Sequence, residues 1–96
     1  MPDYRVTMTM GGVRAGVAPS TILPTAAAAV AEFTMVEASD ITVVAGAARI
    51  TVRFEADDAE LAGQIAAHAV GVTHGAVDVV DFRVTERVGG RWRTVH

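Results

Sequence analysis

Apolar and polar side chains alternate along three stretches of the chain, residues 4–10, 49–55 and 80–87. A period of two places successive side chains on opposite faces of a strand, so each stretch predicts a strand with one face on a core. A β-branched run at residues 41–45 predicts a fourth strand, which a tight turn joins to the strand at 49–55. These two strands are expected to form an antiparallel hairpin.

The spacing of apolar residues between these strands predicts two helices. Pro24 suits a first helical position, which favours a helix over residues 24–38. Its buried stripe is expected at every third or fourth position, namely Ala26, Val30, Phe33 and Val36.

The second helix is expected to begin within residues 56–60, where an aspartate can cap the free amide groups, and to end at Gly71 or Gly75. Its predicted core face is Leu61, Ile65, Ala69 and Val72.

The resulting order of strand, helix, strand, strand, helix, strand is that of a ferredoxin-like α+β sandwich. Right-handed crossovers put both helices on one face of a four-stranded antiparallel sheet and leave the other face open. Gly89 and Gly90 predict a hairpin turn into a short extra C-terminal strand at residues 91–95. The alternation slips between Val79 and Val80, which indicates either a strand start or a β-bulge. Residues 1–96 are expected to form a single domain.

Composition excludes several kinds of chemistry. The chain has no cysteine, which rules out disulfides, thiol catalysis and cysteine-bound zinc. His68 and His74 are six residues apart and therefore do not share a helix face as two metal ligands would. No catalytic or metal motif stands out, so we expect no metal and no cofactor. The chain begins without a signal-peptide pattern and contains no bilayer-length apolar run, which predicts a cytoplasmic protein with no membrane contact.

The charges are distributed unevenly along the chain. The predicted strands carry seven arginines against three carboxylates, whereas the predicted helices and their flanks carry seven carboxylates and no arginine. This distribution predicts an acidic helical layer and a basic sheet. Alternation directs five arginines to the open face, together with several threonines; they are Arg5, Arg49, Arg53, Arg83 and Arg87. Trp92 lies between two arginines in the last strand and is either a cover for the core edge or an interface anchor.

These features lead to a hypothesis of a non-catalytic interaction or assembly module. It would self-associate as a homo-oligomer, or bind a protein partner, through the open sheet face or the C-terminal hairpin, because arginine is enriched at interfaces. An alternative is the binding of an anionic small molecule or nucleic acid on the Arg/Thr-rich face. Nucleic acid is disfavoured because Tyr4 and Phe54 have inward parity and leave no outward stacking platform.

One loop suggests a third function. The segment Gly11-Gly12-Val13-Arg14-Ala15-Gly16-Val17 lies between the first strand and the first helix. It is similar to the anion-cradling loop of acylphosphatases, which share this fold, if one residue is inserted. The resemblance implies hydrolysis of acyl phosphates, with Arg14 as the charged contact. That family positions water with an asparagine, and this chain has none. A flexible connection is the alternative interpretation of the loop.

Overall fold

A computed structural model describes all 96 residues. It contains five strands, two α-helices and one short 3-10 helix. In chain order these are β1 (Asp3–Val13), η1 (Pro19–Thr21), α1 (Ile22–Ala31), β2 (Val36–Val44), β3 (Ala47–Glu55), α2 (Ala59–His74), β4 (Val77–Val88) and β5 (Arg91–Thr94).

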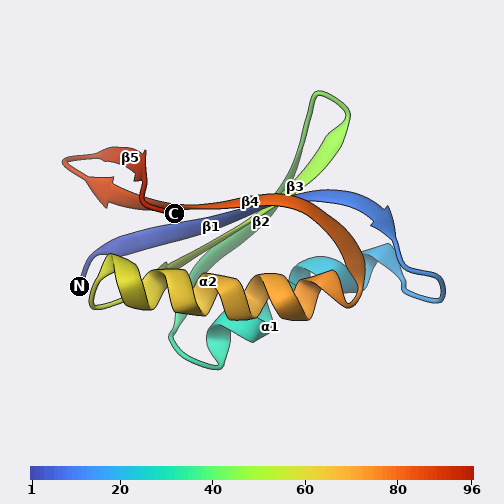
Figure 1. The fold of residues 1–96 in the computed structure, drawn as a ribbon, viewed down its shortest axis with the longest axis horizontal. Coiled ribbons are helices and arrows are strands. Elements are labelled where there is room, and N and C mark those ends of the chain that lie inside the picture. Colours follow the sequence, from blue (N-terminus) through green and yellow to red (C-terminus); the bar gives the residue numbers. More distant parts are fainter.

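The five strands form one antiparallel sheet in the order β2-β3-β1-β4-β5, and both helices lie on the same face of it (Figure 1). The first four positions in this order have the ferredoxin-like topology, so the predicted fold and the extra C-terminal strand are confirmed. β1 is the central strand, because it pairs with β3 on one side and with β4 on the other. Neither helix has the length and hydropathy needed to cross a bilayer.

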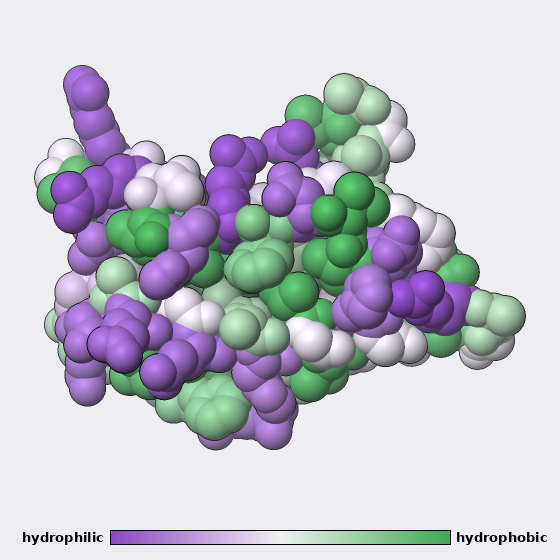
Figure 2. Space-filling model, in the orientation of Figure 1, coloured by the Kyte–Doolittle hydropathy of each residue, from purple (hydrophilic) through white to green (hydrophobic).

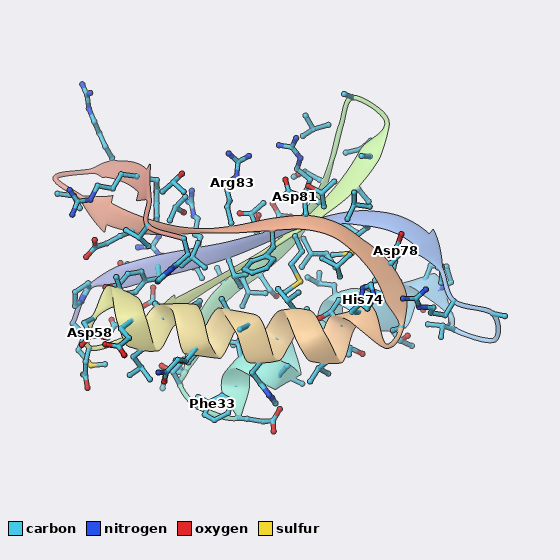
Figure 3. All side chains as sticks on the ribbon, in the orientation of Figure 1. Phe33, Asp58, His74, Asp78, Asp81 and Arg83 are labelled. Carbon is cyan, nitrogen blue, oxygen red and sulfur yellow. The ribbon has the colours of Figure 1, made fainter.

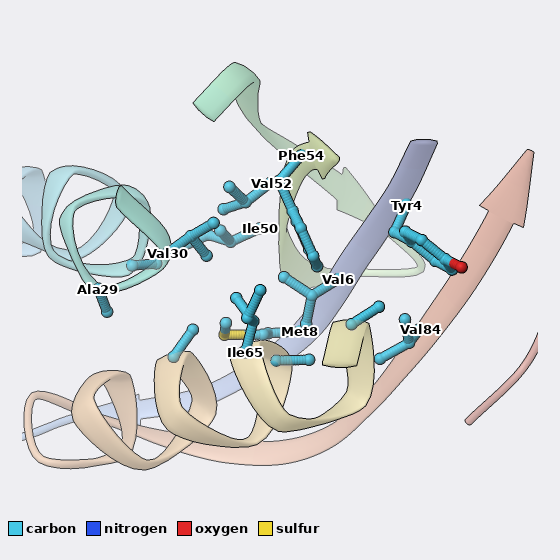
Figure 4. Packing of buried hydrophobic residues seen from close by; sticks show 14 of the residues in the cluster. Tyr4, Val6, Met8, Ala29, Val30, Ile50, Val52, Phe54, Ile65 and Val84 are labelled. Atoms are coloured by element: carbon cyan, nitrogen blue, oxygen red, sulfur yellow. The ribbon is translucent and has the colours of Figure 1, made fainter. Parts of the chain in front are cut away.

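Alternation along the central strands builds the core. Tyr4, Val6 and Met8 of β1 and Val52 and Phe54 of β3 are fully buried under the helices (Figure 4). The rings of Tyr4 and Phe54 stack with their centroids 6.2 Å apart. The sheet therefore contributes the large side chains of the core, and the space that remains for the helices is narrow.

Helix α2 fits this narrow space with small side chains. Its buried residues are mostly alanines, namely Ala62, Ala66 and Ala69, together with Ile65 and Thr73. The predicted core face was rotated relative to this one, because Leu61 and Val72 are exposed. The predicted start of the helix was close: Asp58 is the N-cap, and its carboxylate accepts a hydrogen bond from the Leu61 amide at 2.8 Å.

Helix α1 is shorter than the sequence predicts. It ends at Ala31, and the Thr34 hydroxyl then donates a hydrogen bond of 2.9 Å to the Glu55 carbonyl, which turns the chain into β2. Phe33, expected in the core, is 59% exposed. β2 consequently begins at Val36, five residues before the predicted start, and residues 36–38 are strand where helix was predicted.

The β1–β4 ladder contains the irregularity that the slip between Val79 and Val80 indicates. Its register shifts between Thr9 and Met10 and again between Met10 and Val13, which confirms the bulge. Val80 lies at the bulge and is exposed. Phe82 and Val84 pair with the buried Met8 and Val6, so their predicted inward direction is confirmed, but only Val84 is buried and Phe82 stays 40% exposed. β1 also runs through Gly11, which was predicted to end it; a Cβ at Gly11 would lie 3.0 Å from Val80 Cγ2.

Ile50 and Ile41 are direct cross-strand neighbours, and Ile50 is fully buried whereas Ile41 is 50% exposed. We expect Ile50→Ala to lower the free energy of unfolding by about 2–5 kcal/mol, because it leaves a cavity in the core. The matched variant Ile41→Ala should cost at most about 1 kcal/mol. Urea unfolding measures both, and equal losses would contradict this assignment of the core.

Candidate functional site

The face of the sheet opposite the helices, called here the open face, carries the predicted arginines. Strand pairing sets Arg5 directly opposite Arg53 on one side and Thr85 on the other, and sets Thr7 between Thr51 and Arg83. Figure 3 shows Asp81 and Arg83 projecting from β4 away from the two helices. The same parity places Arg49 and Arg87 on this face.

Carboxylates share the open face in equal number. Five arginines (Arg5, Arg49, Arg53, Arg83, Arg87) stand among five acids (Asp3, Glu37, Asp40, Glu55, Asp81). The predicted division into a basic sheet and an acidic helical layer is therefore wrong. Its cause is the boundary of β2: Glu37 and Asp40 were assigned to the helical layer, and both belong to this strand.

Arg53 is the centre of a compact ionic cluster. Its Nη2 donates to Asp3 Oδ2 at 2.6 Å, and its Nε lies 3.1 Å from Glu37 Oε2. The register shift between Val36 and Ala38 marks a bulge in β2, and Glu37 is the residue at this bulge. The Nε contact is an ion pair without hydrogen-bond geometry, since this nitrogen has no hydrogen-bond partner.

The cluster could offer oxygen ligands to a metal, because carboxylate oxygens of Asp3, Glu37 and Glu55 lie within 4.8 Å of one another. The Arg53 guanidinium, however, is already bound to two of these three acids. Its positive charge compensates part of the negative charge of the three carboxylates and would compete with a metal ion for their oxygens.

The cluster shifts the protonation equilibria of its members in opposite directions. The hydrogen bond from Arg53 lowers the pKa of Asp3, although burial acts against it. Burial, followed by the neighbouring Asp3 and Glu55, raises the pKa of Glu37. The hydrogen bond to Asp3 raises the pKa of Arg53, so this guanidinium stays charged.

Trp92 covers the paired arginines from the C-terminal hairpin. The Arg5 guanidinium carbon lies 3.9 Å from the centroid of the indole ring, and that of Arg53 lies 5.3 Å from it. Two like charges directly opposite each other destabilise a strand pair. The electron-rich indole face, together with Asp3 and Glu37, offsets this repulsion. Trp92 is thus half-buried against the open face and not over the core edge.

A pocket of about 330 Å³ opens between β2 and the arginine pair, and we call it the open-face pocket. Its lining residues are Arg5, Ala38, Ser39, Asp40, Thr51 and Arg53. The Thr51 hydroxyl is 3.4 Å from that of Thr7. Arg5 and Asp40 form no side-chain hydrogen bond or ion pair. Figure 2 shows hydrophilic side chains projecting on this side of the molecule between the two hairpins.

A second pocket, of about 390 Å³, lies on the helical side. Phe33, Leu61, Gln64 and Ile65 line it, so its walls are mainly apolar. His68 lies beside it and binds Glu32 at 2.8 Å while packing edge-on against Phe33. No ionisable group lines this pocket, so the charged groups that a ligand could contact line the open-face pocket.

The loop that is similar to acylphosphatases does not form a cradle. Gly11 and Gly12 belong to β1, where the ladder with β4 continues to Val13. The Arg14 side chain donates to the His74 carbonyl at 3.0 Å and contacts the His74 ring at 3.1 Å. Arg14 thus binds the C-terminal end of α2. It is not free to contact an anion in the loop, as the hydrolase interpretation requires.

Comparisons with known proteins add information on the fold. No protein-family model matches the chain, and no curated protein matches it in sequence. A solved structure from Chloroflexus aurantiacus, assigned as an antibiotic biosynthesis monooxygenase, is similar with a TM-score of 0.51 and 12% sequence identity. The match covers 93% of this chain and 96% of that one. At this identity the likeness shows the ferredoxin-like fold alone.

The functional hypothesis from the sequence is corrected by these findings. The non-catalytic assembly module is not kept, because the solved structure that shares this fold carries the description of an antibiotic biosynthesis monooxygenase. The equal numbers of arginines and carboxylates remove the basic face on which anion or nucleic-acid binding depended. Self-association through the open face or the hairpin has no support in the structure.

Sequence reasoning named Arg5, Arg53 and Trp92 but missed the acids beside them. Asp40 could have been found, because residues 40–43 alternate polar and apolar and so extend the predicted strand backwards. Glu37 gives no such signal, since a bulge interrupts the alternation. Arg49, Arg83 and Arg87 lie on the same face but do not line the pocket.

The opposite pKa shifts of Asp3 and Glu37 predict opposite effects of neutralising them. A lowered pKa means that Asp3 stabilises the fold above the ordinary aspartate value of about 3.9, and that this contribution is lost as the pH falls through the folded pKa. Asp3→Asn should therefore destabilise the protein at pH 7 and have little effect in strong acid.

A raised pKa means that ionised Glu37 opposes folding once the pH rises through its folded value. Glu37→Gln should keep or increase the free energy of unfolding at pH 7. Urea unfolding from acid to neutral pH tests both variants, with Asp57→Asn as the control, since Asp57 is exposed and unpaired. A loss of stability at pH 7 in Glu37→Gln would show that the ion pair with Arg53 outweighs burial.

Proposed function

We propose that this protein binds a small organic molecule without net charge in the open-face pocket. The observation that carries the proposal is a polar hollow whose arginines and carboxylates compensate each other. The volume of about 330 Å³ is at the lower end of the roughly 300–1,000 Å³ typical of ligand pockets, which favours a small ligand.

The balance of charge supports a net-neutral ligand over an anion. An anion entering the pocket would meet Arg5 but also the carboxylate of Asp40 in the lining. Arg53 would not attract it strongly, because Asp3 and Glu37 already neutralise this guanidinium. A net charge of either sign on the ligand is thus repelled by part of the lining.

Arg5 is the residue best prepared to hold such a molecule. One face of its guanidinium stacks on Trp92, which fixes the planar group, while its N–H groups have no side-chain acceptor. A guanidinium offers several N–H donors in one plane, so an oxygen of the ligand could accept two of them at once. Trp92 and Arg53 act as supports in this arrangement, and Thr51 adds a hydroxyl to the lining.

Binding can be followed through Trp92, the single tryptophan of the chain. We expect its fluorescence to change during titration with members of a panel of small polar compounds, and calorimetry should give the same affinity. Arg5→Met should weaken binding roughly tenfold or more, because it removes a charged hydrogen-bond donor while keeping an unbranched side chain.

The control is Arg91→Met, which removes an exposed arginine near the tip of the β4–β5 hairpin, away from the pocket lining. It should bind like the unmodified protein. Equal losses in both variants, or no binding anywhere in the panel, would contradict the proposal.

Oxidation of the bound molecule by O₂ is a second candidate function. The observation that favours it is the fold shared with the structure assigned as an antibiotic biosynthesis monooxygenase. In such a reaction one oxygen atom enters the molecule and the other leaves as water. The two electrons and two protons come from the substrate itself or from an added organic reductant.

This candidate requires the product to carry an oxygen atom from O₂. Incubation of the protein and a bound ligand under isotopically labelled O₂, followed by mass spectrometry, should show the label in the product. Arg5→Met should slow its appearance, and Arg91→Met should not. If the ligand is fully bound but is recovered unchanged and without label, the oxidation is contradicted and the binding function stands.

A further inference from the structure

We infer that the molecule held in the open-face pocket is a zwitterion, with one anionic group for Arg5 and one cationic group for Asp40. This inference rests on the proposed function and names its ligand class. The starting observation is that these two residues are the unpaired charges of the lining, and that their signs are opposite.

The other charges near the pocket are already satisfied. Arg53 binds Asp3 and Glu37, and the same contacts occupy the two acids. An anionic group of a ligand at Arg53 would have to share this guanidinium with two carboxylates that already compensate its charge. The cluster therefore forms one wall of the pocket. Arg5 and Asp40 are the lining residues whose charges remain available to a ligand.

The two free charges approach the pocket from different strands. Arg5 belongs to β1 and Asp40 to β2, with β3 between them. The usual strand spacing puts their backbones roughly 10 Å apart across the sheet. Asp40 pairs with Thr51, whereas Arg5 pairs with Arg53, so the side chains leave the sheet from different rows. A molecule with separated charged ends can contact both residues at once.

Arg5 and Asp40 each disfavour a ligand whose only charge has the same sign as their own. A simple carboxylate would bind Arg5 but leave Asp40 unpaired and close to a like charge. A simple amine would bind Asp40 and place its charge near Arg5. A zwitterion pairs both groups and adds no net charge to a face on which arginines and carboxylates balance.

The test uses compounds of matched length with both charges or one. γ-Aminobutyrate, butyrate and butylamine form one set; phenylalanine, 3-phenylpropanoate and phenethylamine form the other, with the charges closer together. Calorimetry should show that the zwitterion of at least one set binds about tenfold or more tightly than both of its partners, because a paired charged hydrogen bond is gained at each end.

The variants assign each end of the ligand. Asp40→Asn should reduce the zwitterion to the affinity of the matching acid, and Arg5→Met should reduce it to that of the matching amine. In the double variant the three compounds of a set should bind alike. Asp57→Asn and Arg91→Met, which remove an exposed acid and an exposed arginine elsewhere, should leave the preference unchanged.

The outcomes separate this inference from the proposed function. If uncharged polar compounds bind in the open-face pocket and zwitterions have no advantage, the ligand class is wrong and the binding function stands. The inference that the ligand is a zwitterion is also overturned if an amine binds as tightly as its zwitterion, or if Asp40→Asn does not change the affinity. If no compound binds, both proposals fail. Should Arg5→Met not fold, Asp40→Asn decides alone, because Asp40 is exposed and asparagine matches its shape.

Discussion

The double pairing of β1 is the constraint on which the rest of the structure depends. Because β1 has a partner on each side, its alternation fixes the faces of β3 and β4 as well. Tyr4, Val6 and Met8 are thereby committed to the core, which α2 covers mainly with alanines. The same register forces Arg5 and Arg53 to face each other on the open face.

This arginine pair explains why distant segments meet at one place. Two guanidinium groups side by side need compensation, and Asp3 supplies it from the start of the chain. Glu37 supplies it from a bulge in the edge strand β2, and Trp92 from the C-terminal hairpin. The cluster neutralises Arg53 more completely than Arg5, and this asymmetry leaves one guanidinium available at the pocket.

The sequence was sufficient for the topology and insufficient for the site, for one physical reason. Alternation reports burial of one strand face, so it found the strands that lie under the helices. β2 is exposed along almost its whole length, and its sequence has no reason to alternate throughout. Just before its start, Thr34 donates a hydrogen bond to the distant Glu55 carbonyl, a contact that no local pattern encodes. The error in this one boundary is why the sequence analysis assigned Glu37 and Asp40 to the helical layer.

The displacement of two carboxylates changes the functional conclusion more than it changes the fold. With Glu37 and Asp40 counted among the helices, the open face is a basic surface suited to anions or partners. With both on β2, the face is balanced, Arg53 is neutralised, and Asp40 stands across the pocket from Arg5. Since the ferredoxin-like fold supports unrelated functions, the fold cannot choose between these interpretations. The choice follows from which charges remain unpaired, and here they are one of each sign.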